Sequence, residues 1–193
     1  MRRRTFDALM ITAGLALAAV LTVGGGLLTW AHSFVSDQVG TQLAAQQIYF
    51  PERGSDALAD PAIKPYLSQY AGQQLTTGEQ AKAYADHFIA VHIDEMTQGQ
   101  TYAQLSAKSL ANPDDQKLAG LVNTVFKGET LRGLLLNAYA FGQMATIALH
   151  GAIAAFVGAG LMLLLALLGL AHLRRVPAEQ EVRIGAGLGV TTA

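Results

Sequence analysis

The side chains best suited to chemistry gather in one short stretch, from Asp86 to Glu95. It holds two histidines, His87 and His92, among several carboxylates. In zinc proteases two histidines four residues apart share one ion, because that spacing places both rings on one helix face. His87 and His92 are five residues apart, which is about 140° around a helix. His87, His92 and Glu95 are therefore weak metal candidates only, and we predict no metal site.

No other pattern in the chain is typical of an enzyme. We find no phosphate-binding loop, no dinucleotide fingerprint and no serine-hydrolase elbow. The chain has no cysteine, which excludes disulfides, thiolate metal sites and cysteine nucleophiles. His150 and His172 stand at the predicted ends of a membrane helix, where interfacial anchoring explains both, although a functional role stays open for His150. We predict no catalytic residue, no cofactor and no enzymatic activity.

An uncharged run from Leu134 to Leu173, closed by Arg174 and Arg175, organises the chain. Forty helical residues span ~60 Å, whereas the hydrocarbon core of a bilayer is only ~30 Å thick. We predict that 150–173 crosses the membrane and that 134–149 projects beyond it. The alternative is a tilted helix, or one broken at Gly142 or Gly151.

The projecting part is apolar on nearly every side, so we expect other protein to cover it. It then forms the central helix of a bundle, and the preceding hundred residues form its cover. Its apolar residues are Leu134, Leu135, Leu136, Tyr139, Phe141, Met144 and Ile147.

A second uncharged run, 8–31, follows three arginines and ends beside Trp30. We predict a membrane span, since a cleaved signal peptide has a shorter apolar core of about 7 to 15 residues. The helix continues past Trp30 until Pro51. Small residues four apart let membrane helices approach closely. The candidate packing residues are Gly14, Ala18, Thr22, Gly26, Gly151, Ala155 and Gly158.

The residues between the two runs predict further helices and no strand. Caps, prolines and apolar periodicity place helices at about 61–70, 77–98 and 101–110, and a fourth from 112–115 to Lys127-Gly128. Capping boxes are expected at Thr76 with Glu79 and at Thr101 with Gln104. The predicted fold is all-α: two transmembrane helices with an extracytoplasmic helical bundle between them, the second helix continuous from bundle into membrane.

Charge predicts the orientation. Between Asp37 and Arg132 there are eleven acidic and seven basic residues, whereas arginines gather near both ends of the chain. Basic residues mark the cytoplasmic side. We therefore expect 1–7 and a mobile tail, 174–193, in the cytoplasm, and 32–149 outside the cell membrane.

Two segments, GQQLTTGEQAKAYADHFIAVHIDEM and KGETLRGLLLNAYAFGQMA, resemble a group of uncharacterised two-span membrane proteins of high-GC Gram-positive (actinobacterial) bacteria. The resemblance covers most of the chain and implies the same two-span layout. It implies no activity. Some members carry a ring-cleavage dioxygenase label, which the absent metal-ligand spacing does not support.

Two functions agree with these observations. The first is a non-enzymatic membrane protein that acts as an accessory subunit of an envelope complex or forms a homo-oligomer. The second is an extracytoplasmic module that binds or senses a small molecule or lipid. The expected partners are the lipid bilayer and other protein chains, and no nucleic acid, because net charge is near zero.

Overall fold

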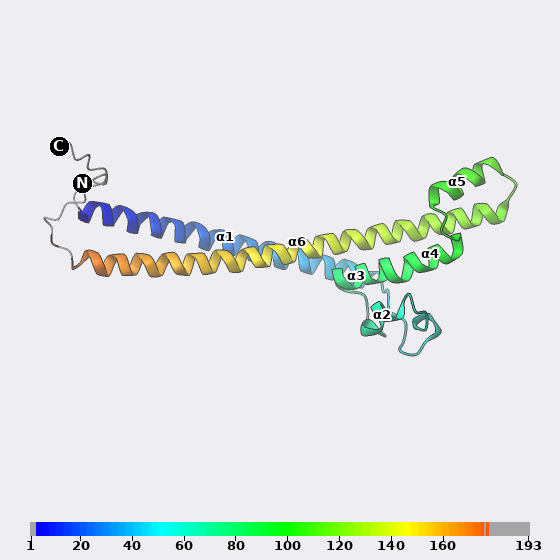
Figure 1. The fold of residues 1–193 in the computed structure, drawn as a ribbon, viewed down its shortest axis with the longest axis horizontal. Coiled ribbons are helices and arrows are strands. Elements are labelled where there is room, and N and C mark those ends of the chain that lie inside the picture. The colour runs from blue at the N-terminus through cyan, green and yellow to red at the C-terminus, as the bar shows by residue number, and fades with distance from the viewer. Residues whose placement is uncertain (1–2, 176, 178–193) are drawn as a thin grey trace, which may run out of the picture. The chain divides into compact units, whose positions relative to one another are not determined.

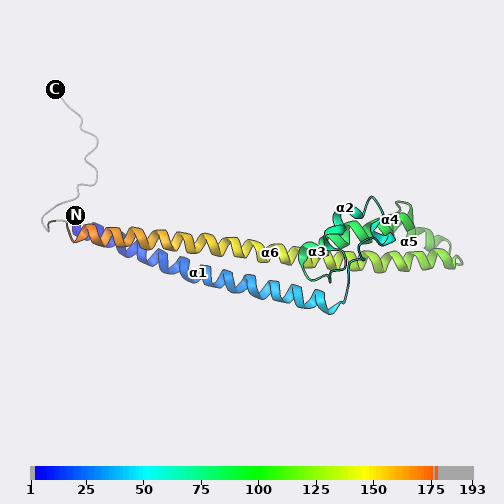
Figure 2. The same cartoon turned by 90° about the horizontal axis from the view of Figure 1, so that it is seen from below.

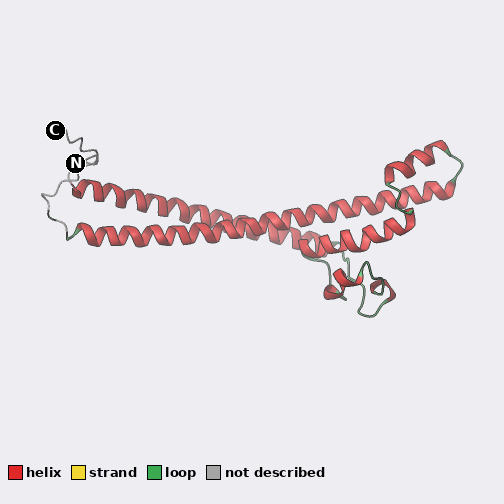
Figure 3. Cartoon of the chain, in the orientation of Figure 1, coloured by secondary structure: helices red, strands yellow, loops and turns green. Residues whose placement is uncertain are grey.

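The chain is folded almost entirely into helices. A computed structural model describes residues 3–175 and 177, and no strand forms among them (Figures 1 and 3). A lone antiparallel bridge joins Tyr49 and Gln74. The elements are α1 (Arg3–Ala45), η1 (Asp56–Leu58), α2 (Lys64–Leu67), η2 (Ser68–Tyr70), α3 (Gly78–Tyr84), the π-helical η3 (Ala85–Ile89), α4 (Ala90–Thr97), α5 (Tyr102–Ala111) and α6 (Gln116–Leu173). Most of the predicted tail lies outside the described residues.

The chain divides into two compact units. The helix-pair unit contains 1–31 and 148–193, and the multi-helix unit contains 32–147. Helices α1 and α6 each contribute to both units, and both are long and apolar enough to cross a membrane. Within the helix-pair unit the two helices run side by side (Figures 1 and 2).

The multi-helix unit has two cores. The larger joins α1, α2 and α3 to α6 around Leu43, Leu67, Leu75 and Leu135, all of which are buried. The smaller joins α4, α5 and α6 through Ile93, Leu105 and Val125. Helices α3 and α4 lie along α6 in both views (Figures 1 and 2). The unit is therefore built on α6.

Local signals explain where several helices begin and end. The box at Thr101 and Gln104 is confirmed. The box predicted at Thr76 and Glu79 is wrong by one residue. The Thr77 hydroxyl oxygen accepts from the backbone N–H of Gln80, and the Gln80 side-chain oxygen accepts from the backbone N–H of Thr77. Helix α1 continues past Trp30 as predicted, and it ends at Ala45, before Pro51. Gln47, at φ 52°, follows in the left-handed region that terminates helices.

The break predicted at Lys127-Gly128 is wrong, because α6 runs without interruption from Gln116 to Leu173. A Cβ atom built on Gly128 would lie 2.9 Å from Cδ1 of Ile93. The glycine makes room for Ile93 and does not end a helix. The predicted start at 112–115 is also displaced, since the Asp115 carboxylate accepts the N–H groups of Lys117 and Leu118 and caps α6.

The prediction that other protein covers 134–149 of α6 is correct for one face only. Leu135 is 2 % exposed, whereas Leu134 is 62 %, Phe141 53 %, Met144 60 % and Ile147 69 % exposed. The reason is geometric: α3, η3 and α4 line one side of α6, and an apolar helix needs neighbours on all sides to be buried. The chain by itself leaves a long apolar face open.

Candidate functional site

Small residues form the contact between α1 and α6 in the helix-pair unit. The facing pairs are Gly14 with Ala166, Leu21 with Gly158, and Leu28 with Gly151. A Cβ atom built on Gly158 would lie 3.2 Å from Cδ1 of Leu21. Residue numbers fall along α6 as they rise along α1, so the helices are antiparallel. The backbones approach closely because glycine and alanine occupy the contact.

The other predicted packing residues have mixed positions. Ala18 is buried, and Ala155 is half-buried. The Thr22 hydroxyl donates to the carbonyl of Ala18 at 2.8 Å, which satisfies it within its own helix. Gly26 is exposed and a Cβ atom built on it would meet nothing within 4 Å, whereas one built on Gly25 would lie 3.0 Å from the ring of Phe156.

Burial in this unit follows a seven-residue repeat that four-residue spacing did not reveal. Within this unit the buried residues of α1 are Ile11, Ala18 and Gly25, and those of α6 are Ala152, Ala159 and Ala166. A strict seven-residue repeat is typical of two helices that supercoil to keep one seam in contact. The repeat is visible in the sequence and could have identified the seam.

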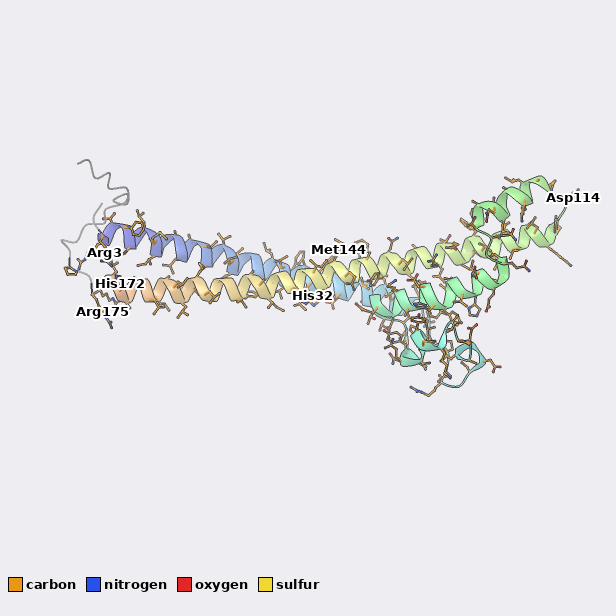
Figure 4. The ribbon with its side chains drawn as sticks, viewed as in Figure 1. Arg3, His32, Asp114, Met144, His172 and Arg175 are labelled. Atoms are coloured by element: carbon orange, nitrogen blue, oxygen red, sulfur yellow. The ribbon has the colours of Figure 1, made fainter. Side chains whose placement is uncertain are left out.

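The predicted membrane-end histidines differ in their contacts. An Arg3 guanidinium nitrogen lies 3.2 Å from Nε2 of His172 (Figure 4). Arginine can only donate, so Nε2 is the acceptor in this contact. His150 is exposed.

The metal candidates do not converge. The ring of His87 stacks on Tyr66, with ring centroids 3.5 Å apart and planes at 4°. His92 donates from Nδ1 to the carbonyl of Phe88 at 2.7 Å, and Glu95 is exposed. Within 3–175 and 177, no group of three metal-ligating side chains could hold an ion.

Charged side chains gather instead around Asp86, on the π-helical η3. We call Lys82, Asp86, Glu129 and Arg132 the Asp86 cluster. Lys82 pairs with Asp86. Arg132 of α6 pairs with Asp86 of η3 and with Glu129, three residues earlier on α6, each at 3.4 Å. A π-helical turn inserts one residue into a helix and often occurs at functional positions. Periodicity in the sequence did not predict it.

The Asp86 cluster has a clear electrostatic effect. The hydrogen bond from Lys82 holds the pKa of Asp86 below its ordinary value, and the Arg132 guanidinium adds to this shift. The same bond raises the pKa of Lys82. Burial raises the pKa of the nearby Tyr84. Because Arg132 on α6 pairs with Asp86 on η3, the cluster joins these two elements.

The multi-helix unit has a groove between α1 and α6. Its volume is about 600 Å³. None of its lining residues is charged: Phe34, Val35, Gln38, Val39, Gln42, Leu43, Gln46, Leu131, Leu134, Leu135, Asn137, Ala138 and Phe141. The groove includes part of the exposed apolar face of α6, at Leu134 and Phe141. It is suited to binding an uncharged partner.

Comparison with known proteins adds no relative. No protein-family model matches the chain, and neither the curated proteins nor the solved structures contain a match. The groove, the helix pair and the charge pattern are therefore the features that bear on function.

Proposed function

We propose that this chain is a non-enzymatic integral membrane protein that serves as a structural or accessory subunit of a cell-envelope complex or homo-oligomer. In this proposal 8–31 and 150–173 cross the membrane. The segments 1–7 and 174–193 lie in the cytoplasm, and the helical domain 32–149 stands on the outer side.

The exposure of the two long helices supports the membrane part of the proposal. In the most apolar stretch of each, only 11 % of the residues are buried. The apolar core helix of a soluble protein is mostly buried, so these helices need another apolar surrounding. The hydroxyls of Thr12, Thr22 and Thr29 donate to carbonyls four residues earlier, which suits a setting without water.

The groove carries the functional part of the proposal. Phe34, Leu134 and Phe141 line it and are each more than half exposed. Helix α6 is much longer than a single span needs, because 58 residues extend ~87 Å, and in this proposal the three residues lie outside the spans. A contiguous apolar surface in water marks a contact with another molecule. A subunit that contacts other chains here accounts for the groove without requiring catalysis.

Gentle purification from native membranes tests the proposal. We expect the chain to resist alkaline carbonate extraction and to elute, in mild detergent, at the mass of an oligomer or with a defined set of partner proteins. Release by carbonate would contradict the membrane assignment. A membrane-bound monomer without protein partners would contradict the subunit assignment.

The size of the groove favours a second candidate. Small-molecule sites occupy about 300–1,000 Å³, and the groove lies within that range. A domain that binds a lipid or another apolar ligand would purify as a monomer with one extractable ligand per chain. Mass spectrometry of an organic extract separates this candidate from the first.

A further inference from the structure

The walls of the groove repeat with the spacing of a helix-packing seam. On α6 the lining residues Leu131, Leu134, Ala138 and Phe141 are three, four and three apart. On α1, Val35, Val39 and Gln42 are four and three apart, and Gln46 follows four residues later, just past the end of the helix. Alternating steps of three and four bring side chains onto the line where helices interdigitate. Each wall extends for about three turns, long enough to receive another helix.

This seam differs from the one that the chain already uses, although Val39 and Ala138 also pack against the larger core. Leu135 reaches the chain's own core, whereas Leu134 and Phe141 are open to solvent. Side chains one position away on a helix point about 100° apart. Helix α6 therefore has one apolar seam that is filled within the chain and a second that is unfilled.

The polar groups of the groove are complementary to themselves. Gln38, Gln42, Gln46 and Asn137 are amides, which both donate and accept hydrogen bonds. Gln42 donates to Gln38 at 3.4 Å along the edge of α1. A two-fold contact places a surface against its own copy, which an uncharged surface with amides permits and a surface of one charge opposes. A lipid chain would bury these amides without hydrogen-bond partners, which is unfavourable.

We propose that the groove receives a second copy of this chain, and that α1 and α6 of the two copies form a four-helix bundle. The inference rests on the proposed membrane location, because anchoring in one bilayer raises the effective concentration of the copies and aligns their grooves. Each groove then contacts the same surface on an identical chain.

Cross-linking of single cysteines tests the inference, because the natural chain has none. Leu134→Cys and Phe141→Cys place a thiol in the groove, whereas Ala140→Cys, a matched control, places it on an exposed residue outside the groove. Native membranes that carry each variant are treated with a short bis-maleimide. We expect cross-linked dimers from the two groove variants and at least about tenfold less dimer from Ala140→Cys, because only thiols within the contact between the copies lie close enough for a short cross-linker.

A second pair of variants tests the chemistry of the contact. Leu134→Glu places like charges against each other in the dimer and should reduce cross-linking through Phe141→Cys about tenfold or more. Ala140→Glu should leave it unchanged. Both sites are exposed, so circular dichroism should show that both variants keep the helical content of the parent.

Several results would overturn the inference. They are equal cross-linking at Ala140→Cys and Phe141→Cys, no dimer from either groove variant, a different protein captured in place of the second copy, and a monomer with lipid in its groove. Carbonate extraction of the same membranes tests the membrane location separately from the groove contact. A chain released by carbonate refutes the proposed membrane location, whereas a retained chain without groove cross-links refutes the groove contact alone.

Discussion

Gly78, at the start of α3, lies directly against Gly142 of α6: a Cβ atom built on either glycine would be 3.5 Å from the Cα of the other. A Cβ atom on Gly78 would also lie 3.1 Å from Cα of Tyr139 and 3.3 Å from the carbonyl oxygen of Ala138. These neighbours are backbone atoms, which cannot rotate away. The first turn of α3 therefore packs on the backbone of α6.

Gly78→Val should destabilise the multi-helix unit by about 1–3 kcal/mol, since the added side chain forces two backbones apart. Gly120→Ala is the control, because a Cβ atom there would meet nothing within 4 Å and alanine favours helix by about 1 kcal/mol. Pulse proteolysis in mild detergent measures both. Equal stability of the two variants would show that the close approach is not required.

Leu135→Ala should cost about 2–5 kcal/mol, because Leu135 is fully buried in the larger core and its loss leaves a cavity. The adjacent Leu134→Ala should change the free energy of unfolding by no more than about 0.5 kcal/mol in the monomer, since Leu134 is exposed. Protease sensitivity of 32–147 compares them. A larger effect at Leu134 in a monomeric preparation would contradict the assignment of the two seams.

The Asp86 cluster predicts a dependence of stability on pH. The folded-state pKa of Asp86 is below its unfolded value, so its contribution is fully present above the unfolded value and is lost as pH falls through the folded one. We expect stability to decline below about pH 4 and Asp86→Asn to flatten that decline. The pKa of Lys82 is raised, so its effect has the opposite pH dependence. Its contribution to stability is fully present below the unfolded-state pKa and is lost as pH rises through the folded-state pKa. Glu52→Gln, outside the cluster, is the control, and the same slope in all three proteins would refute this assignment.

Replacement of His87 and His92 together by glutamine should leave the metal content of the purified protein unchanged. The His87 ring stacks on Tyr66, and the His92 ring donates to the carbonyl of Phe88. The two rings therefore have different partners and do not share a site. Elemental mass spectrometry gives the content per chain. Loss of one equivalent of metal on replacement would require a shared site.

Reporter fusions test the orientation. A reporter inserted at Gly54 should be active only on the outer side of the membrane, and one placed after Ala193 only in the cytoplasm, because arginines gather near both ends of the chain. Alkaline phosphatase and a green fluorescent protein give opposite readouts at each site. Activity of both reporters on the same side would rule out two spans.

Much of the helical architecture follows from local sequence. The absence of strands among the described residues, the continuation of α1 past Trp30 and the capping box at Thr101 each depend on residues close in the chain. The error at Gly128 has a different cause. Gly128 resembles a helix end, and only the distant Ile93 explains why a glycine stands inside α6. Tertiary packing decided that position, and no local pattern contains it.

The candidate surfaces show the same limit. Apolar residues around α6 predicted a covered helix, but periodicity cannot say how many neighbours are available to cover it. The chain supplies enough to bury Leu135 and too few to bury Phe141. The Asp86 cluster needed a π-helical turn and an arginine 46 residues away, neither of which repeats in the sequence.

The alanine seam of the helix-pair unit has a consequence for how this protein can vary. Ala152, Ala159 and Ala166 are buried although their side chains are small, so a larger residue there needs its neighbours to move. The leucines on the remaining faces are exposed and can exchange among apolar types freely. Mutational tolerance along α6 therefore rises and falls every seven residues, and the most restrictive positions are those with the least side chain.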